Sequence, residues 1–93
     1  MPDLKLTILT PLVKLIDDQP VNVFRLKLSD GKPLSIHPMH APLIAQIGNT
    51  QAEYEQNGII HLIQINNGVL RVFRNHIICA VESANLSESG IND

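Results

Sequence analysis

Residues 59–82 read IIHLIQINNGVLRVFRNHIICAVE, a stretch rich in β-branched and other apolar residues. It divides into three candidate strands, at 59–65, 69–74 and 76–82. The first two are joined by Asn-Asn-Gly at 66–68, and the last two by the very short link Arg74-Asn75. Such links reverse a chain between neighbouring strands, so we expect a meander of antiparallel hairpins.

Upstream, the same two-residue period continues. Leu4, Leu6 and Ile8 alternate with polar residues and predict a half-buried strand that Pro11 ends. A short second strand is expected at 12–16, followed by a polar turn at 17–20 and a third strand at 21–28. The apolar parity changes within that third strand, which predicts a β-bulge near Val23.

The middle of the chain contains the strongest turn signal. Ser-Asp-Gly-Lys at 29–32 predicts a tight hairpin that leads into a short strand at 33–37. Two prolines at 38 and 42 exclude regular structure between them. Residues 43–47 fit either a helical turn or a strand, and 50–56 alternate like an exposed or edge strand. About nine short strands in total predict an all-β sandwich or barrel.

Length and composition set further bounds. Length and composition predict one small soluble domain, with 1–84 as its ordered part and 85–93 as a polar tail that we expect to be disordered. A net charge of −2 favours neither nucleic acid nor an anionic membrane surface as a partner. Apolar runs stop at five residues, there is no secretion signal, and Cys79 has no disulfide partner, all of which favour a cytoplasmic setting.

The sequence contains few residues in patterns that are typical of catalytic or metal-binding sites. His37 and His40 form a His-x-x-His pair, but a zinc site needs three or four convergent ligands, and His61 and His76 cannot be tied to the pair. Cys79 lies in an apolar run typical of a core residue, and no serine lies in a nucleophile motif. We therefore expect no catalytic residue, no cofactor and no metal, and a binding module remains.

Several strands are apolar on both parities, as at 59–60, 62–63 and 77–78. A two-layered sandwich whose outer faces contact water does not need apolar residues on both sides of its strands. Two interpretations stay open: a partner covers one outer face, or the sandwich exposes some apolar side chains as soluble proteins do.

Three segments, in order and spacing, carry a resemblance: LTILTP at 6–11, IHPMHAPLIA at 36–45, which Asp30-Gly31 precedes, and NGVLRV at 67–72. Over residues 4–84 the chain resembles the N-terminal domain of the F-type ATP synthase epsilon subunit. The resemblance implies a flattened β-sandwich of two roughly five-stranded antiparallel sheets. It also implies a non-catalytic rotor subunit that docks on gamma and on the c-ring and couples ion translocation to ATP synthesis or hydrolysis. Such a subunit meets the cytoplasmic face of the inner (plasma) membrane only through the complex.

The resemblance also implies which residues meet the partners. The hairpin Asp30-Gly31-Lys32 matches the loop at the c-ring, residues 37–42 match an adjoining loop at the rotor contact, and Thr10 matches a position near gamma. The expected contact residues are therefore Thr10, Asp30, Gly31, Lys32, His37, Pro38, Met39, His40, Ala41 and Pro42.

The chain departs from the family motif at several positions, and each departure leads to a further expectation. Met39 replaces a glycine, so we expect a differently shaped turn, and Lys32 replaces an acid, which reverses one charge at the c-ring. His40 is expected to pin its loop through the backbone. With nine residues after Ala84, no C-terminal helical hairpin is expected, and hence no ATP binding or inhibition through it. The alternative function is a free-standing metal- or ligand-binding module that uses His37 and His40.

Overall fold

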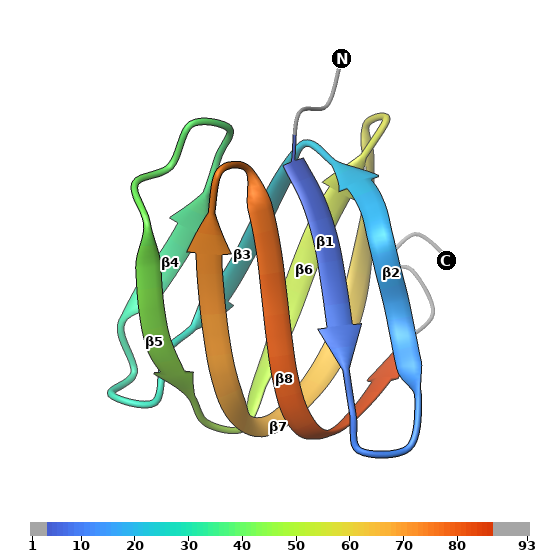
Figure 1. The fold of residues 1–93 in the computed structure, drawn as a ribbon, viewed down its shortest axis with the longest axis vertical. Coiled ribbons are helices and arrows are strands. Elements are labelled where there is room, and N and C mark those ends of the chain that lie inside the picture. The colour runs from blue at the N-terminus through green and yellow to red at the C-terminus, as the bar shows by residue number, and fades with distance from the viewer. Residues whose placement is uncertain (1–3, 87–93) are drawn as a thin grey trace.

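The computed structural model describes residues 4–86, and in them the chain is all β (Figure 1). No helix among these residues is long and apolar enough to span a bilayer. The strands are β1 (Leu4–Leu9), β2 (Lys14–Val21), β3 (Val23–Lys27), β4 (Pro33–Ile36), β5 (Leu43–Ile47), β6 (Thr50–Gln56), β7 (Ile59–Phe73) and β8 (His76–Leu86).

The strands form one hydrogen-bonded sheet that folds into two layers (Figure 1). The long strands β7 and β8 bend and take part in both layers. Layer one is β2-β1-β8-β7-β5, with residues 76–81 of β8 and 68–73 of β7. Layer two is β8-β7-β6-β3-β4, with residues 83–86 of β8 and 59–65 of β7. The expected all-β sandwich is therefore confirmed.

Two details differ from the expected sandwich. The pair β1–β8 is parallel, because the first and last strands both run from the upper to the lower end in Figure 1. Every other strand pair is antiparallel in the described part of the chain. The principal extents of 30, 28 and 26 Å are nearly equal, so the outline is less flattened than the resemblance implies.

The core lies between the two layers. Strands of both layers alternate inward apolar residues with outward residues, and Phe24 is the largest side chain with no exposed surface. The buried cluster consists of Leu4, Leu6, Ile8, Ile16, Val21, Phe24, Leu26, Ile36, Ile47, Ala52, Tyr54, Ile63, Ile65, Leu70, Val72, Ile77, Cys79 and Val81.

The turn expected at residues 17–20 is wrong, because these residues lie in β2, where Gln19 and Pro20 pair with β1. The strand bulges there instead of reversing. Asp18 has a positive φ of 48°, and the pairing register shifts between Leu6 and Ile8. The backbone N–H of Asp18 donates to the Thr7 hydroxyl at 3.0 Å, so this amide is satisfied by a side chain.

The bulge expected near Val23 is also wrong. β2 ends at Val21, and the chain crosses from layer one to layer two at Asn22. The backbone N–H of Asn22 donates to the Glu55 carbonyl at 2.7 Å and fixes the crossing. The change of apolar parity therefore marks a change of layer, since the core lies on opposite sides of the two strands.

The link expected at 66–68 is a bend, not a hairpin. Asn67 has a positive φ of 44°, but Gly68 does not, and a tight Asn-Gly hairpin needs both. β7 therefore continues through 66–68, and residues 4–86 contain eight strands where about nine were expected. The true hairpins are at Asn57-Gly58 and at Arg74-Asn75, where both residues of each pair have positive φ.

Three further expectations have definite outcomes. Residues 43–47 form a strand rather than a helical turn. β6 lies between β3 and β7, so it is an interior strand and not an edge. β8 extends through Leu86, and the rest of the expected tail lies outside the described residues.

Candidate interaction surface

The residues expected to meet partners fall at two opposite ends of the sandwich. Thr10 and the hairpin at 29–32 lie at the lower end in Figure 1, with the bends of β7 and β8. The loop at 37–42 lies at the upper end, on the same side as the turn between β7 and β8. β4 runs between the two loops, so loops that are close in sequence are separated by the length of a strand.

The hairpin at 29–32 is tightly fixed. Gly31 N–H donates to the Leu28 carbonyl, and Leu28 N–H donates to the Lys32 carbonyl, both at 2.9 Å. Gly31 has a φ of 87°, as in a turn followed by a left-handed residue. The Asp30 carboxylate accepts from Lys32 N–H at 3.0 Å. The tip therefore presents the exposed side chains of Asp30 and Lys32 on a rigid backbone.

The loop at 37–42 contains a turn with the type II signature. His40 N–H donates to the His37 carbonyl at 3.2 Å, and Pro38 and Met39 are the central residues. Met39 adopts a φ of 69°, a region that favours glycine. The expectation of a differently shaped turn is therefore wrong. The Asn75 side chain accepts from Met39 N–H at 2.7 Å and ties this turn to the β7–β8 hairpin.

His40 bonds to the backbone of its own loop. Its Nδ1 lies 2.7 Å from the Ala41 carbonyl oxygen, so Nδ1 carries the proton and donates. This contact is the one expected from a residue that pins the loop. Its importance for partner binding stays a prediction.

The histidines do not converge. His61 stacks on Tyr54, with ring centroids 4.9 Å apart, and His76 bonds locally to the Arg74 carbonyl. No three His, Cys, Asp or Glu side chains within residues 4–86 lie close enough to hold a metal ion. The pair His37 and His40 therefore finds no third ligand in this part of the chain.

Thr10 stabilises the loop between β1 and β2 through its side chain. Its hydroxyl accepts from the backbone N–H of Val13 at 3.1 Å and of Leu12 at 3.3 Å. The loop presents Leu12 with 96% of its surface exposed. Sequence reasoning missed this apolar tip, although Pro11-Leu12-Val13 after the first strand was a signal for it.

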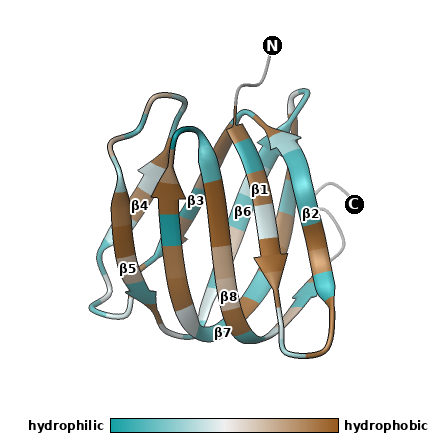
Figure 2. Cartoon of the chain, in the orientation of Figure 1, coloured by the Kyte–Doolittle hydropathy of each residue, from teal (hydrophilic) through white to brown (hydrophobic). Residues whose placement is uncertain are grey.

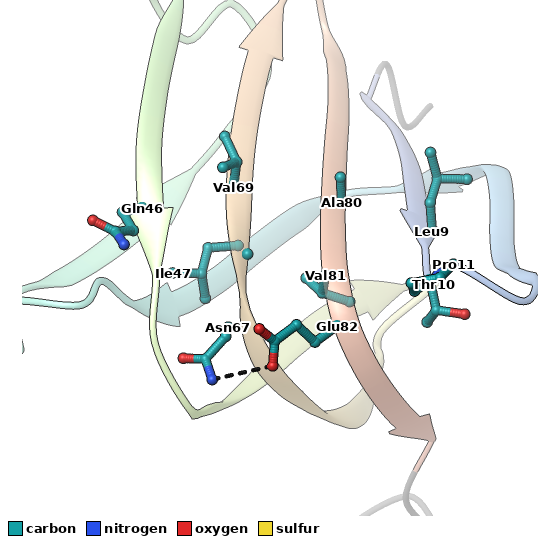
Figure 3. A pocket seen from close by; sticks show the side chains of 11 residues that line it. Leu9, Thr10, Pro11, Gln46, Ile47, Asn67, Val69, Ala80, Val81 and Glu82 are labelled. Carbon is teal, nitrogen blue, oxygen red and sulfur yellow. Dashed lines mark hydrogen bonds between the residues drawn. The ribbon is translucent and has the colours of Figure 1, made fainter.

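An open groove of about 680 Å³ lies beside Thr10 at the lower end (Figure 3). Leu9, Val69 and Ala80 give it apolar walls. Glu82 is its only charged lining residue, and Asn67 donates to that carboxylate at 3.5 Å.

The outer face of layer one carries exposed apolar side chains. Ile44 pairs across β5–β7 with Arg71, and Arg71 pairs across β7–β8 with Ile78. Ile44 is 73% exposed, and Val69 and Phe73 stand on the same face of β7. Figure 2 shows the apolar bands along these front strands. The two consecutive apolar residues at 77–78 indicated an apolar outer face in the sequence. The sequence did not indicate Ile44, because residues 43–47 fitted either a helical turn or a strand.

The Cys79 thiol is unreactive in the folded protein. The residue has no exposed surface, and burial raises the pKa of its thiol from 9.0 to about 12. The thiolate is the nucleophilic form, so the side chain acts as a small core residue, as expected.

A two-layered all-β domain with fixed loops and a partly apolar outer face matches a known family. The family model for the ATP synthase, Delta/Epsilon chain, beta-sandwich domain matches residues 3–87, and the chain belongs to this family. Within the family, the chain is 30% identical over 89 residues to the ATP synthase epsilon chain of Symbiobacterium thermophilum. That alignment covers 96% of this chain and 63% of the relative, so the chain spans less than two thirds of its length.

Two solved assemblies contain chains with the same fold. One is the mitochondrial ATP synthase of Euglena gracilis, OSCP/F1/c-ring, with a TM-score of 0.83 and 16% identity over 89% of this chain and 52% of that one. The other is the central stalk/c-ring of the Tetrahymena thermophila mitochondrial ATP synthase, with a TM-score of 0.75 and 11% identity over 89% and 66%.

Proposed function

We propose that this chain acts as a non-catalytic epsilon subunit of the central stalk of an F-type ATP synthase. It docks on the gamma subunit and on the c-ring, and so helps to couple ion translocation to ATP synthesis or hydrolysis. Family membership and the epsilon-chain relative support this role. The complex holds the domain at the cytoplasmic face of the membrane, which the domain itself does not enter.

The observation that carries the proposal is the apolar outer face of layer one. Ile44, Val69, Phe73 and Ile78 expose large apolar side chains on neighbouring strands, around Arg71. Burying such side chains against a partner contributes roughly 25 cal/mol for each Å² of apolar surface. This face therefore suits a stable protein contact, and we assign it to gamma.

The hairpin at 29–32 suits the c-ring. It is rigid, its tip is polar, and it lies at the lower end, away from the loop at 37–42. Lys32 offers the ring a cation where the family commonly offers an acid. Thr10 and its apolar loop also lie at the lower end, and we assign them to gamma, while residues 37–42 reach the rotor from the upper end.

Co-expression with the gamma subunit of the same organism tests the proposal. We expect the two chains to copurify, and we expect Ile44→Glu to weaken the complex at least about tenfold, because it places a charge in an apolar contact. Ile60→Glu is the matched control, since Ile60 is 44% exposed on the outer face of layer two. Failure of the wild-type chain to copurify, or equal loss in both variants, would overturn the proposal.

A further inference from the structure

A basic and aromatic cluster occupies the upper end of the outer face of layer one. We define the basic–aromatic cluster as Lys5, Arg71, Phe73, Arg74 and His76. Strand register brings it together, because His76 pairs with Phe73 on one side and with Lys5 on the other. In Figure 2 the turn between β7 and β8 is hydrophilic, and β7 carries a further hydrophilic band lower down, within its apolar part.

Phe73 holds both arginines in place. The guanidinium carbon of Arg71 lies 5.9 Å from the ring centroid, and that of Arg74 lies 5.2 Å from it. Both distances are within the range of cation–π attraction. Phe73 remains 44% exposed, so the ring orders two cations and still presents surface to a partner. Ordered side chains lose less entropy when a partner binds them.

The cluster has no internal counter-charge. The ion pairs within residues 4–86 are Lys14–Asp17 and Arg25–Glu53, and neither involves the cluster. Its three permanent cations are concentrated at one end of a face, although the chain carries a net charge of −2. A local charge opposite to the overall charge indicates a specific electrostatic partner rather than general attraction to polyanions.

We propose that the basic–aromatic cluster binds an acidic segment of the gamma subunit, and this inference rests on the function proposed above. Ile78 adjoins the cluster, and Arg71 lies between Ile44 and Ile78, so the cluster reaches into the apolar face. Arginine is a common anchor residue within apolar parts of protein interfaces. The cluster orients gamma on the face, and an anionic membrane is the less suited partner because the chain as a whole is negative.

Charge reversal of one arginine tests the inference. We expect Arg71→Glu to raise the Kd for isolated gamma about tenfold at about 50 mM salt, and the effect to shrink at about 500 mM salt. Arg71→Lys keeps the charge and retains most of the affinity. Lys27→Glu makes the same charge change on an exposed residue of layer two and stays near the wild-type Kd. Thermal unfolding of each variant shows that the fold is intact.

The outcomes separate this inference from the proposed function. Wild-type binding to gamma with equal Kd for Arg71→Glu and Lys27→Glu overturns the acidic-segment contact and leaves the rotor role standing. No wild-type complex overturns the rotor role, and the inference falls with it. Binding of the wild type to vesicles with about 30% anionic lipid, lost in Arg71→Glu while gamma binding is unchanged, assigns the cluster to membrane and also overturns the inference.

Discussion

Met39 holds a backbone conformation that glycine adopts at much lower cost. Its φ of 69° is left-handed, which costs a residue with a Cβ roughly 1–2 kcal/mol. The side chain is 84% exposed, so little packing is lost when it is removed. We expect Met39→Gly to raise the free energy of unfolding by about 1 kcal/mol, and the midpoint of thermal unfolding by about 4–8 °C.

Met39→Ala is the matched control, because it removes the same side chain and keeps the Cβ. We expect its midpoint to stay within about 2 °C of the wild type. If the alanine variant gained as much as the glycine variant, the gain would come from the lost side chain and not from relief of backbone strain.

The backbone conformation of individual turn residues could be predicted only in part from the sequence. Asp30-Gly31 adopts the hairpin that its sequence indicates, because glycine supplies the positive φ that the turn needs. Met39 does not follow its local preference, since Asn75, 36 positions away in the chain, accepts its N–H and helps to hold the turn. A local pattern cannot contain that hydrogen bond.

The bend of β7 depends on Gly68. An added Cβ would lie 2.2 Å from the Ala80 carbonyl oxygen and 2.7 Å from the Val81 Cα, so the backbone of β8 would have to move. We therefore expect Gly68→Ala to lower the free energy of unfolding by about 3 kcal/mol, measured by urea titration. The strand pair β7–β8 is continuous through both layers, so this strain acts on the whole sheet.

Gly48→Ala provides the comparison at the same bend. Gly48 accepts a hydrogen bond from Asn67 N–H, and an added Cβ would meet Ser29 at an ordinary 3.6 Å. We expect its cost to stay below about 1 kcal/mol. Equal costs for the two variants would show that the close approach at Gly68 is unimportant.

The positions of most strands were predictable because alternation of apolar and polar residues is a local property. Whether a strand reverses, bulges or bends was not. Asp-Asp-Gln-Pro at 17–20 looks like a turn, yet Thr7 on the neighbouring strand holds the chain in the sheet. Asn-Asn-Gly at 66–68 looks like a hairpin, yet Asn66 and Gly68 both pair with β8, so the strand continues from one layer into the other.

At the scale of the whole molecule, the expected contacts could be predicted only as separate loops. Only the four residues of β4 separate the hairpin at 29–32 from the loop at 37–42, and this strand places the two loops at opposite ends. The apolar face and the basic–aromatic cluster arise from strand pairing between distant segments, including the parallel pair β1–β8. A partner that meets both ends must therefore run along the sandwich, which the outer face of layer one allows.

The sealed core makes the stability of the whole molecule sensitive to alkaline pH. Burial raises the pKa of Cys79 from 9.0 to about 12 and also raises the pKa of Tyr54. Between pH 9 and 12 the unfolded chain releases the thiol proton while the folded chain retains it. The folded state then binds more protons, so the free energy of unfolding falls as pH rises, by about 1.4 kcal/mol per pH unit for the thiol.

Cys79→Ala isolates the thiol from this trend. The variant loses packing at every pH, by about 1 kcal/mol, but it has no thiol to ionise. Tyr54 remains in both proteins, so its contribution cancels in the difference. Urea unfolding across the alkaline range should therefore show the wild type losing its advantage above pH 9, with the two curves crossing at about pH 10. Curves that stay parallel would mean that the thiol ionises as readily in the folded core as in the unfolded chain.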